Sequence, residues 1–226
     1  MGSGRASASG RRQHRSGHGG GRERGEAVNF LAHAWLAGPH PADRLGGLMG
    51  DFIKGPLPGA LAPAVASGVR LHRRIDVFAD SHPAFLRSRA RVSTARRRVA
   101  GVMVDMFYDH FLARDWAEFH PEPLADFTAA QYRLLEEAPG LPERLQKILP
   151  SMRDDDWLAS YRDVETVAYA LERMAGRLRP GNPLAGGGAE LLMHYADFAA
   201  DCREFLPDTR AFAQAFWQRD GFSAAE

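Results

Sequence analysis

The pattern of apolar and polar positions is helical from residue 28 to the C-terminus. Apolar residues recur at spacings of three and four, as at positions 99, 102, 103, 106, 107 and 111, and this spacing is typical of a buried helix. Proline and glycine separate the helical segments, at residues 38–39, 55–63, 82–83 and 139–140. No segment combines sustained alternation with enrichment in β-branched residues. We therefore predict an all-α fold.

The last third of the chain is predicted to contain three helices, over residues 155–178, 189–206 and 208–220. A segment rich in glycine and proline separates the first two. Asp208 follows a proline and precedes an amphipathic run, so we expect it to cap the N-terminus of the last helix.

Composition divides the 226 residues into two parts. Residues 1–27 consist largely of Gly, Ser, Arg and His, have almost nothing to bury, and are predicted to be a disordered extension. Residues 28–226 are sufficient for one self-supporting domain. Cys202 is the single cysteine, which excludes an internal disulfide and fits a reducing cytosol. The apolar runs fall far short of the roughly 20 residues that span a bilayer.

Positive charge is concentrated in residues 70–98, which contain nine arginines and two aspartates and so carry a net charge of +7. A basic segment on an otherwise acidic body suggests that a negatively charged partner meets this face. The alternative is a solvated helix face whose counter-charges lie elsewhere in the fold. Charge alone leaves both interpretations open.

Titratable side chains interrupt the most apolar of the predicted helices. These are His33, Asp51, His72, Asp76, Asp105, Asp109 and His110. An unpaired carboxylate is costly to bury, so their positions require an explanation. Residues four apart lie one above the other on a helix, about 5–6 Å between Cβ atoms. This spacing allows His72 with Asp76, and Asp105 with Asp109, to chelate an ion.

Mixed imidazole and carboxylate ligands suit Mn²⁺, Fe²⁺, Mg²⁺ or Zn²⁺, and the lack of cysteine ligands disfavours a structural zinc. Each residue also has a simpler explanation, as a hydrogen-bonded core histidine, a surface His–Asp pair or a counter-charge to an arginine. Several such residues in neighbouring helices, beside a basic segment, favour a metal site. Adjacent arginines would then bind a phosphate, because the guanidinium group matches its oxygens.

Several blocks of the chain resemble the acyl carrier protein phosphodiesterase family, also called ACP hydrolyase. They are VNFLAHAWLA, LMGDFIKG, GVRLHRRIDVFAD, VDMFYDHFLARDW, WLASYRDVETVAYALERMAGRL and HYADFAADCREFLP. The resemblance covers residues 28 to roughly 210. Members of the family usually begin Met-Asn-Phe, which makes Val28 the expected start of the native chain.

The resemblance implies a cytoplasmic enzyme that hydrolyses the phosphodiester joining 4′-phosphopantetheine to a serine of holo-acyl carrier protein. It also implies a divalent metal, preferably Mn²⁺, that activates a water, and an all-helical fold distantly similar to the HD phosphohydrolases. Unlike the HD pattern, none of the nine histidines is followed by aspartate. The nearest analogue is Asp109-His110, so individual ligands are not assigned by order alone.

Carried over by position, the expected metal ligands are His33, Asp51, His72, Asp76 and Asp109. The expected catalytic residues are Asp76, Asp109, His110, Arg73 and Arg74, of which the two arginines stabilise the phosphoryl oxygens. An acidic acyl carrier protein is the expected partner, steered by the basic segment. The residues expected to dock it are Arg70, Arg87, Arg89, Arg91, Arg96, Arg97 and Arg98.

Two alternatives remain open. One is an HD-type metal-dependent hydrolase of a nucleotide or small phosphodiester. The other is a non-catalytic helical module that binds an acidic protein through the basic segment, which would require no clustered ligands. We expect no membrane and no nucleic acid among the partners, and the sequence does not define the oligomeric state.

Overall fold

The structure is a computed structural model that describes Met1, residues 29–178 and residues 181–220. Within these ranges the chain is helical, with no β-strand, which confirms the predicted all-α class. Residues 2–28 are not described, so the predicted extension over residues 1–27, except Met1, and the expected start at Val28 lie outside the described part. No helix of the described part is long and apolar enough to cross a membrane.

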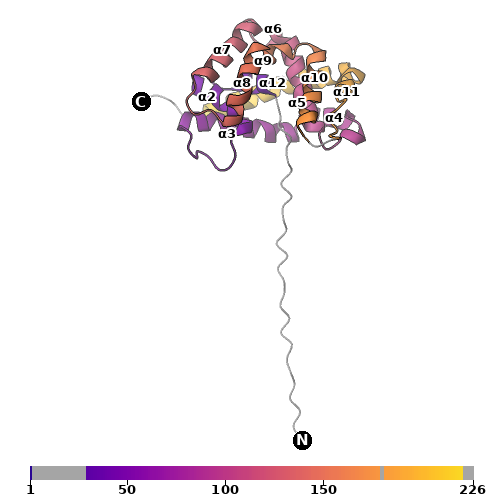
Figure 1. Ribbon diagram of the computed structural model, residues 1–226, viewed down its shortest axis with the longest axis horizontal. Helices are drawn as coiled ribbons and strands as arrows, with labels where there is room; N and C mark the ends of the chain where they lie inside the picture. Colours follow the sequence, from indigo (N-terminus) through magenta and orange to yellow (C-terminus); the bar gives the residue numbers. More distant parts are fainter. Residues whose placement is uncertain (2–28, 179–180, 221–226) are drawn as a thin grey trace.

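Most helices follow one another along the chain with short connections, and a longer connection, over residues 53–62, joins η1 to α3 (Figure 1). The α-helices are α1 (Phe30–Leu36), α2 (Pro41–Met49), α3 (Pro63–Ser81), α4 (Pro83–Arg91), α5 (Ala100–Arg114), α6 (Trp116–Phe119), α7 (Leu124–Glu137), α8 (Glu143–Asp154), α9 (Trp157–Ser160), α10 (Val164–Arg177), α11 (Gly188–Met193) and α12 (Tyr195–Asp220). Two short 3₁₀ helices are η1 (Gly50–Phe52) and η2 (Thr94–Arg96).

Helix α5 lies at the centre of the molecule and contacts α1, α4, α10 and α12. Its Met103, Val104, Met106 and Phe107 are fully buried. A helix that is apolar around most of its circumference is stable only inside a core, and this position satisfies that requirement. Because α5 touches the helices at both ends of the chain, it fixes where α1 lies relative to the rest of the fold.

Helices α2 and α3 approach each other at two glycines. A Cβ on Gly46 would lie 2.3 Å from the carbonyl oxygen of Val65, and one on Gly68 would lie 2.3 Å from the carbonyl oxygen of Asp43. No side chain fits at either position, so the two backbones pack directly on each other. The end of α2 is thereby held against the middle of α3, where His72 lies.

The predicted break before Asp208 is wrong, because α12 continues through Pro207 to Asp220. Aromatic packing on both sides of the proline explains the continuity. The ring of Phe78 lies 6.3 Å from that of Phe205 and 4.6 Å from that of Phe212. Asp208 does not cap a helix; its Oδ2 accepts a hydrogen bond from Nε2 of His82 at 3.2 Å.

Two other boundaries also differ from the prediction. The segment 155–178 forms α9 and α10, and the segment 189–206 is divided between α11 and α12.

Replacing Gly68 with alanine tests the contact between α2 and α3. The added methyl group overlaps a backbone oxygen, so Gly68→Ala is expected to lower the free energy of unfolding by about 1–3 kcal/mol. The matched control is Gly176→Ala on α10, where a Cβ would meet nothing within 4 Å. This control is expected to gain roughly 0.5–1 kcal/mol. Urea denaturation measures both, and equal effects would contradict the packing described.

Candidate metal centre

His33 is a buried histidine that has no hydrogen-bond partner. It lies on α1 with 2 % of its surface exposed, and neither ring nitrogen makes a hydrogen bond within the described part of the chain. Its Nε2 lies 3.3 Å from Oδ1 of Asp76, an ion-pair distance without a hydrogen bond. Burial of an unsatisfied polar group costs about 1–3 kcal/mol, so a cation that accepts the lone pair of one ring nitrogen would stabilise this imidazole.

His72 is held on α3 by the close contact with α2. Its Nδ1 lies 2.8 Å from the carbonyl oxygen of Gly47. A carbonyl only accepts, so Nδ1 carries the proton and a neutral ring leaves the lone pair on Nε2 available to a ligand. Gly50 makes room for the ring, because a Cβ there would lie 2.2 Å from Cγ of His72.

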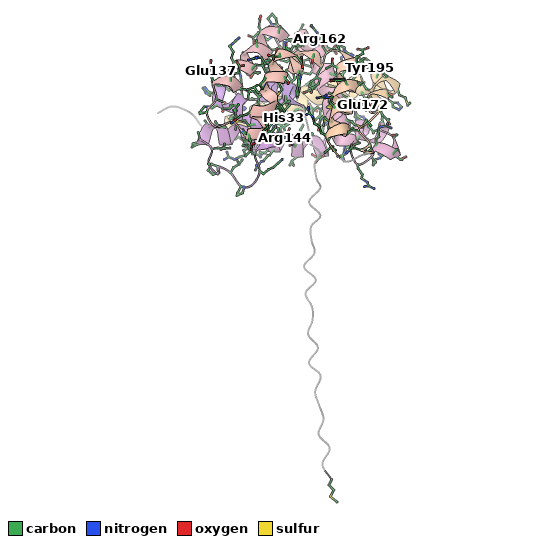
Figure 2. All side chains as sticks on the ribbon, in the orientation of Figure 1. His33, Glu137, Arg144, Arg162, Glu172 and Tyr195 are labelled. Atoms are coloured by element: carbon green, nitrogen blue, oxygen red, sulfur yellow. The ribbon has the colours of Figure 1, made fainter. Side chains whose placement is uncertain are left out.

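Two carboxylates lie beside this Nε2 atom. Oδ1 of Asp51 is 3.4 Å away and Oδ2 of Asp76 is 3.7 Å away. The rings of His33 and His72 stack with centroids 3.7 Å apart. One ligand atom each from His33, His72 and Asp76 lies within 4.8 Å of the other two. The cluster therefore joins α1, η1 and α3 around one point, in the interior of the helical body where Figure 2 labels His33.

The exposure of these side chains is uneven. The two imidazoles are buried, whereas 19 % of the Asp51 side chain and 25 % of the Asp76 side chain are exposed. Solvent and any ligand of the site therefore reach it from the carboxylate side. We call this the open edge of the cluster.

The pKa values of the histidines and of the nearby Asp105 reflect burial and the closely spaced carboxylates. Burial, and then the neighbouring His72, lower the pKa of His33. Burial alone would lower the pKa of His72 too, but the carboxylates of Asp51 and Asp76 outweigh it and raise that pKa. Burial and the negative charges of Asp76 and Asp51 raise the pKa of Asp105 well above its usual value. Carboxylates this close together favour the presence of a cation.

The donor set fits a divalent metal ion. Two imidazole nitrogens and one or two carboxylate oxygens suit Mn²⁺, Fe²⁺ or Zn²⁺, and such a set leaves coordination positions open. The unsatisfied nitrogens of His33 support this fit, because a core histidine without a ligand would normally be hydrogen bonded. The alternative of a non-catalytic module, which requires no clustered ligands, is disfavoured.

Asp109 has a different role from the one expected. Its two carboxylate oxygens accept hydrogen bonds from the backbone amides of Leu31 and Ala32, at 3.0 and 2.9 Å. It is fully buried, and burial raises its pKa to about 8 against the opposing effect of the two amides. Asp109 thus satisfies the N-terminus of α1 and positions His33 without joining the cluster of ligand atoms.

His110 also lies outside the cluster. Its Nδ1 is 2.8 Å from the carbonyl oxygen of Tyr161, and its Nε2 is 2.8 Å from the hydroxyl of Tyr195. The carbonyl only accepts, so Nδ1 carries the proton and Nε2 of the neutral ring accepts from the Tyr195 hydroxyl, which itself accepts a hydrogen bond from Arg114. Figure 2 labels Tyr195 and His33 in separate parts of the molecule. Both ring nitrogens of His110 therefore have partners in the core and lie outside the cluster, and a catalytic role for this residue stays a prediction.

The two arginines that follow His72 do not point at the cluster. Arg73 donates hydrogen bonds of 2.9 Å to the carbonyl oxygens of Ile53 and of Gly55. The guanidinium group of Arg74 lies over the ring of Phe216, 5.5 Å from its centroid. Arg73 therefore holds the connection between η1 and α3, and Arg74 packs against α12.

Much of the basic segment is neutralised by other helices. Arg87 pairs with Asp201 and Glu204, at 2.9 and 2.5 Å. Arg91 also pairs with Asp201, a carboxylate that is only 3 % exposed.

The same holds for two further arginines of the basic segment. Arg89 pairs with Asp80 at 3.0 Å, and Arg96 pairs with Glu190 at 3.3 Å. Glu190 and Asp201 correspond to the alternative of counter-charges elsewhere in the fold, whereas Asp80 belongs to the basic segment itself. Arg97 and Arg98 are exposed and make no hydrogen bond or ion pair with the described residues, and Arg70 is exposed and bonded only to Ser67 of its own helix.

Fold and cluster together define a helical protein in which two buried histidines and a partly exposed carboxylate form a candidate metal centre. The profile of the acyl carrier protein phosphodiesterase family matches residues 28–209. The chain belongs to this family, as the sequence resemblance predicted. No solved structure matches the chain, so the expected similarity to HD phosphohydrolases stays a prediction.

Curated relatives support the assignment. A protein of Photorhabdus laumondii is 35% identical over 182 residues, which cover 80% of this chain and 92% of the relative. One of Yersinia enterocolitica is 34% identical over 189 residues, 83% of this chain and 98% of the relative. One of Serratia proteamaculans is 35% identical over 182 residues, 80% of this chain and 94% of the relative. All three are named acyl carrier protein phosphodiesterase.

Replacing His33 with leucine separates a ligand role from a packing role. Without metal, His33→Leu is expected to raise the free energy of unfolding by roughly 1–3 kcal/mol, because an unsatisfied buried group disappears. With Mn²⁺, the wild type gains stability and the variant does not. Urea denaturation in chelator and in Mn²⁺ measures both effects.

His82 is the matched control, since it is buried with both ring nitrogens hydrogen bonded. His82→Leu is expected to lose stability in chelator and to keep the response to Mn²⁺. A His33→Leu variant that is destabilised in chelator, or that still responds to Mn²⁺, would contradict the ligand role.

Proposed function

We propose that this protein is a metal-dependent phosphodiesterase that hydrolyses the bond between 4′-phosphopantetheine and the serine of holo-acyl carrier protein. The products are the apo-carrier protein and 4′-phosphopantetheine. The names of its relatives support the substrate. The observation that carries the reaction class is the cluster of His33, His72 and Asp76, with two ring nitrogens of His33 left without partners.

The proposed metal ligands are His33, His72 and Asp76, with Asp51 next to them at the open edge. Mn²⁺ is the proposed ion, and Mg²⁺ or Fe²⁺ also suit a site of this kind. A divalent ion bound there would supply charge stabilisation to the phosphoryl oxygens and lower the pKa of a bound water.

The side chains of the cluster would divide the remaining tasks between them. Gly47 and Gly50 fix the tautomer and the orientation of the His72 ring. The buried imidazoles close one side of the site to water, so the phosphodiester enters from the open edge. Since His110 is committed to the core, we assign protonation of the departing serine oxygen to a carboxyl group at this edge.

The carrier protein is proposed to be acidic and to approach this same side. Of the seven arginines expected to dock it, Arg87, Arg89, Arg91 and Arg96 already have acidic partners. Arg70, Arg97 and Arg98 are exposed and remain the proposed docking residues. Exposed charges of this kind act mainly on the association rate and its dependence on salt.

Turnover of holo-carrier protein tests the proposal. With Mn²⁺, mass spectrometry is expected to show conversion to the apo form, and chelator should stop it. Asp76→Asn is expected to reduce kcat/KM at least 10³-fold because a ligand charge is lost, while the helical circular dichroism is unchanged. Asp155→Asn, at an exposed aspartate, is the control that keeps wild-type turnover. Full turnover in chelator, or by Asp76→Asn, would contradict the proposal.

A further inference from the structure

The open edge of the cluster poses an electrostatic problem for an anionic substrate. Its partly exposed groups are the carboxylates of Asp51 and Asp76. The two carboxylates together offset the charge of one divalent ion bound beside them, so a phosphodiester, which carries a negative charge at neutral pH, gains no net attraction here unless a further cation faces the same edge. The residues expected to supply that cation, Arg73 and Arg74, are bound elsewhere.

We infer that Lys54 is the residue that binds the phosphoryl group of the substrate. Its side chain is exposed, and Nζ donates a hydrogen bond of 2.7 Å to the carbonyl oxygen of Asp51. The carboxylate of this same aspartate lies 3.4 Å from Nε2 of His72. The ammonium group is therefore anchored beside the open edge. This role rests on the proposed function, because it assumes a phosphodiester as the substrate.

The ammonium group retains the donors that such a role requires. A lysine has three N–H donors, and the bond to Asp51 uses one of them. The other two are free to bind phosphoryl oxygens. Hydrogen bonds between a cation and an anion are roughly twice as strong as neutral ones, so one contact is sufficient to affect substrate binding.

Arg73 acts as the positioning residue for Lys54. Its two hydrogen bonds go to the carbonyl oxygens of Ile53 and Gly55, the residues on either side of Lys54. The guanidinium group thus holds the backbone around the lysine to α3, the helix that supplies His72 and Asp76. The connection over residues 53–62 otherwise leaves the helical body, as Figure 1 shows below α2 and α3.

The composition of the chain offers a matched control. Its sequence contains two lysines, Lys54 and Lys147, among 29 basic residues. Lys147 is exposed on α8 and pairs with Glu143 of the same helix at 2.7 Å. Removing its charge changes the net charge of the protein by the same amount as removing that of Lys54.

Lys54→Ala, Lys54→Arg and Lys147→Ala are compared in two measurements. The first is the KM for holo-carrier protein in Mn²⁺. Lys54→Ala is expected to raise this KM about tenfold to a hundredfold, the equivalent of one charge-assisted hydrogen bond. Lys54→Arg is expected to keep the KM close to that of the wild type, and Lys147→Ala is expected to leave it unchanged. Arg73→Ala is expected to have a similar but smaller effect.

The second measurement does not depend on turnover. Calorimetry titrates inorganic phosphate into the Mn²⁺-loaded proteins, and Lys54→Ala is expected to weaken phosphate binding at least tenfold while its affinity for Mn²⁺ stays that of the wild type. The inference is overturned if Lys54→Ala binds phosphate as tightly as Lys147→Ala does, or if Lys54→Ala loses affinity for Mn²⁺ and for phosphate in parallel. A wild type that binds phosphate through Lys54 but leaves holo-carrier protein intact would instead refute the proposed function.

Discussion

The backbone contact between α2 and α3 is the constraint on which the site depends. Because Gly46 and Gly68 carry no side chain, the two helices come close enough for the carbonyl of Gly47 to reach Nδ1 of His72. That single hydrogen bond determines the tautomer of the imidazole and thus which nitrogen faces Asp51 and Asp76. The geometry of the cluster therefore follows from helix packing and requires no flexible loop to bring the ligands together.

Other buried charged and polar groups of this protein show why the cluster is exceptional. Asp109 is satisfied by two amides of α1, and Asp201 by Arg87, Arg91 and Ser88. Both follow the general rule that buried polar groups find partners. Single buried atoms of other residues also lack a partner, but His33 leaves both ring nitrogens unpaired, in the same place where two carboxylates face Nε2 of His72. A cation would accept the lone pair of one nitrogen of each imidazole and would neutralise the carboxylates.

The sequence predicted what depends on local periodicity. The all-α class follows from the apolar spacing, and the pairing of His72 with Asp76 follows from their separation by one helical turn. The site could not be fully predicted where a partner comes from a distant segment. The sequence predicts Asp109 as a metal ligand, because the amides of Leu31 and Ala32 that bind its carboxylate come from another helix. It likewise predicts Arg87 and Arg91 as docking residues, because their partner Asp201 lies far away in the sequence, on α12. Pro207 suggested a break that aromatic packing overrides. Lys54 is one of two lysines in a chain rich in arginine, but nothing in the sequence alone indicates that it lies beside Asp51 and His72.

The account rests on a metal ion bound between α1 and α3, and anomalous scattering tests this most directly. Crystals grown with Mn²⁺ are measured on both sides of the manganese absorption edge. The account predicts one strong anomalous peak in contact with Nε2 of His72, a ring nitrogen of His33 and a carboxylate oxygen of Asp76. A map without a peak there, or with manganese at Asp109 and His110 instead, would contradict it.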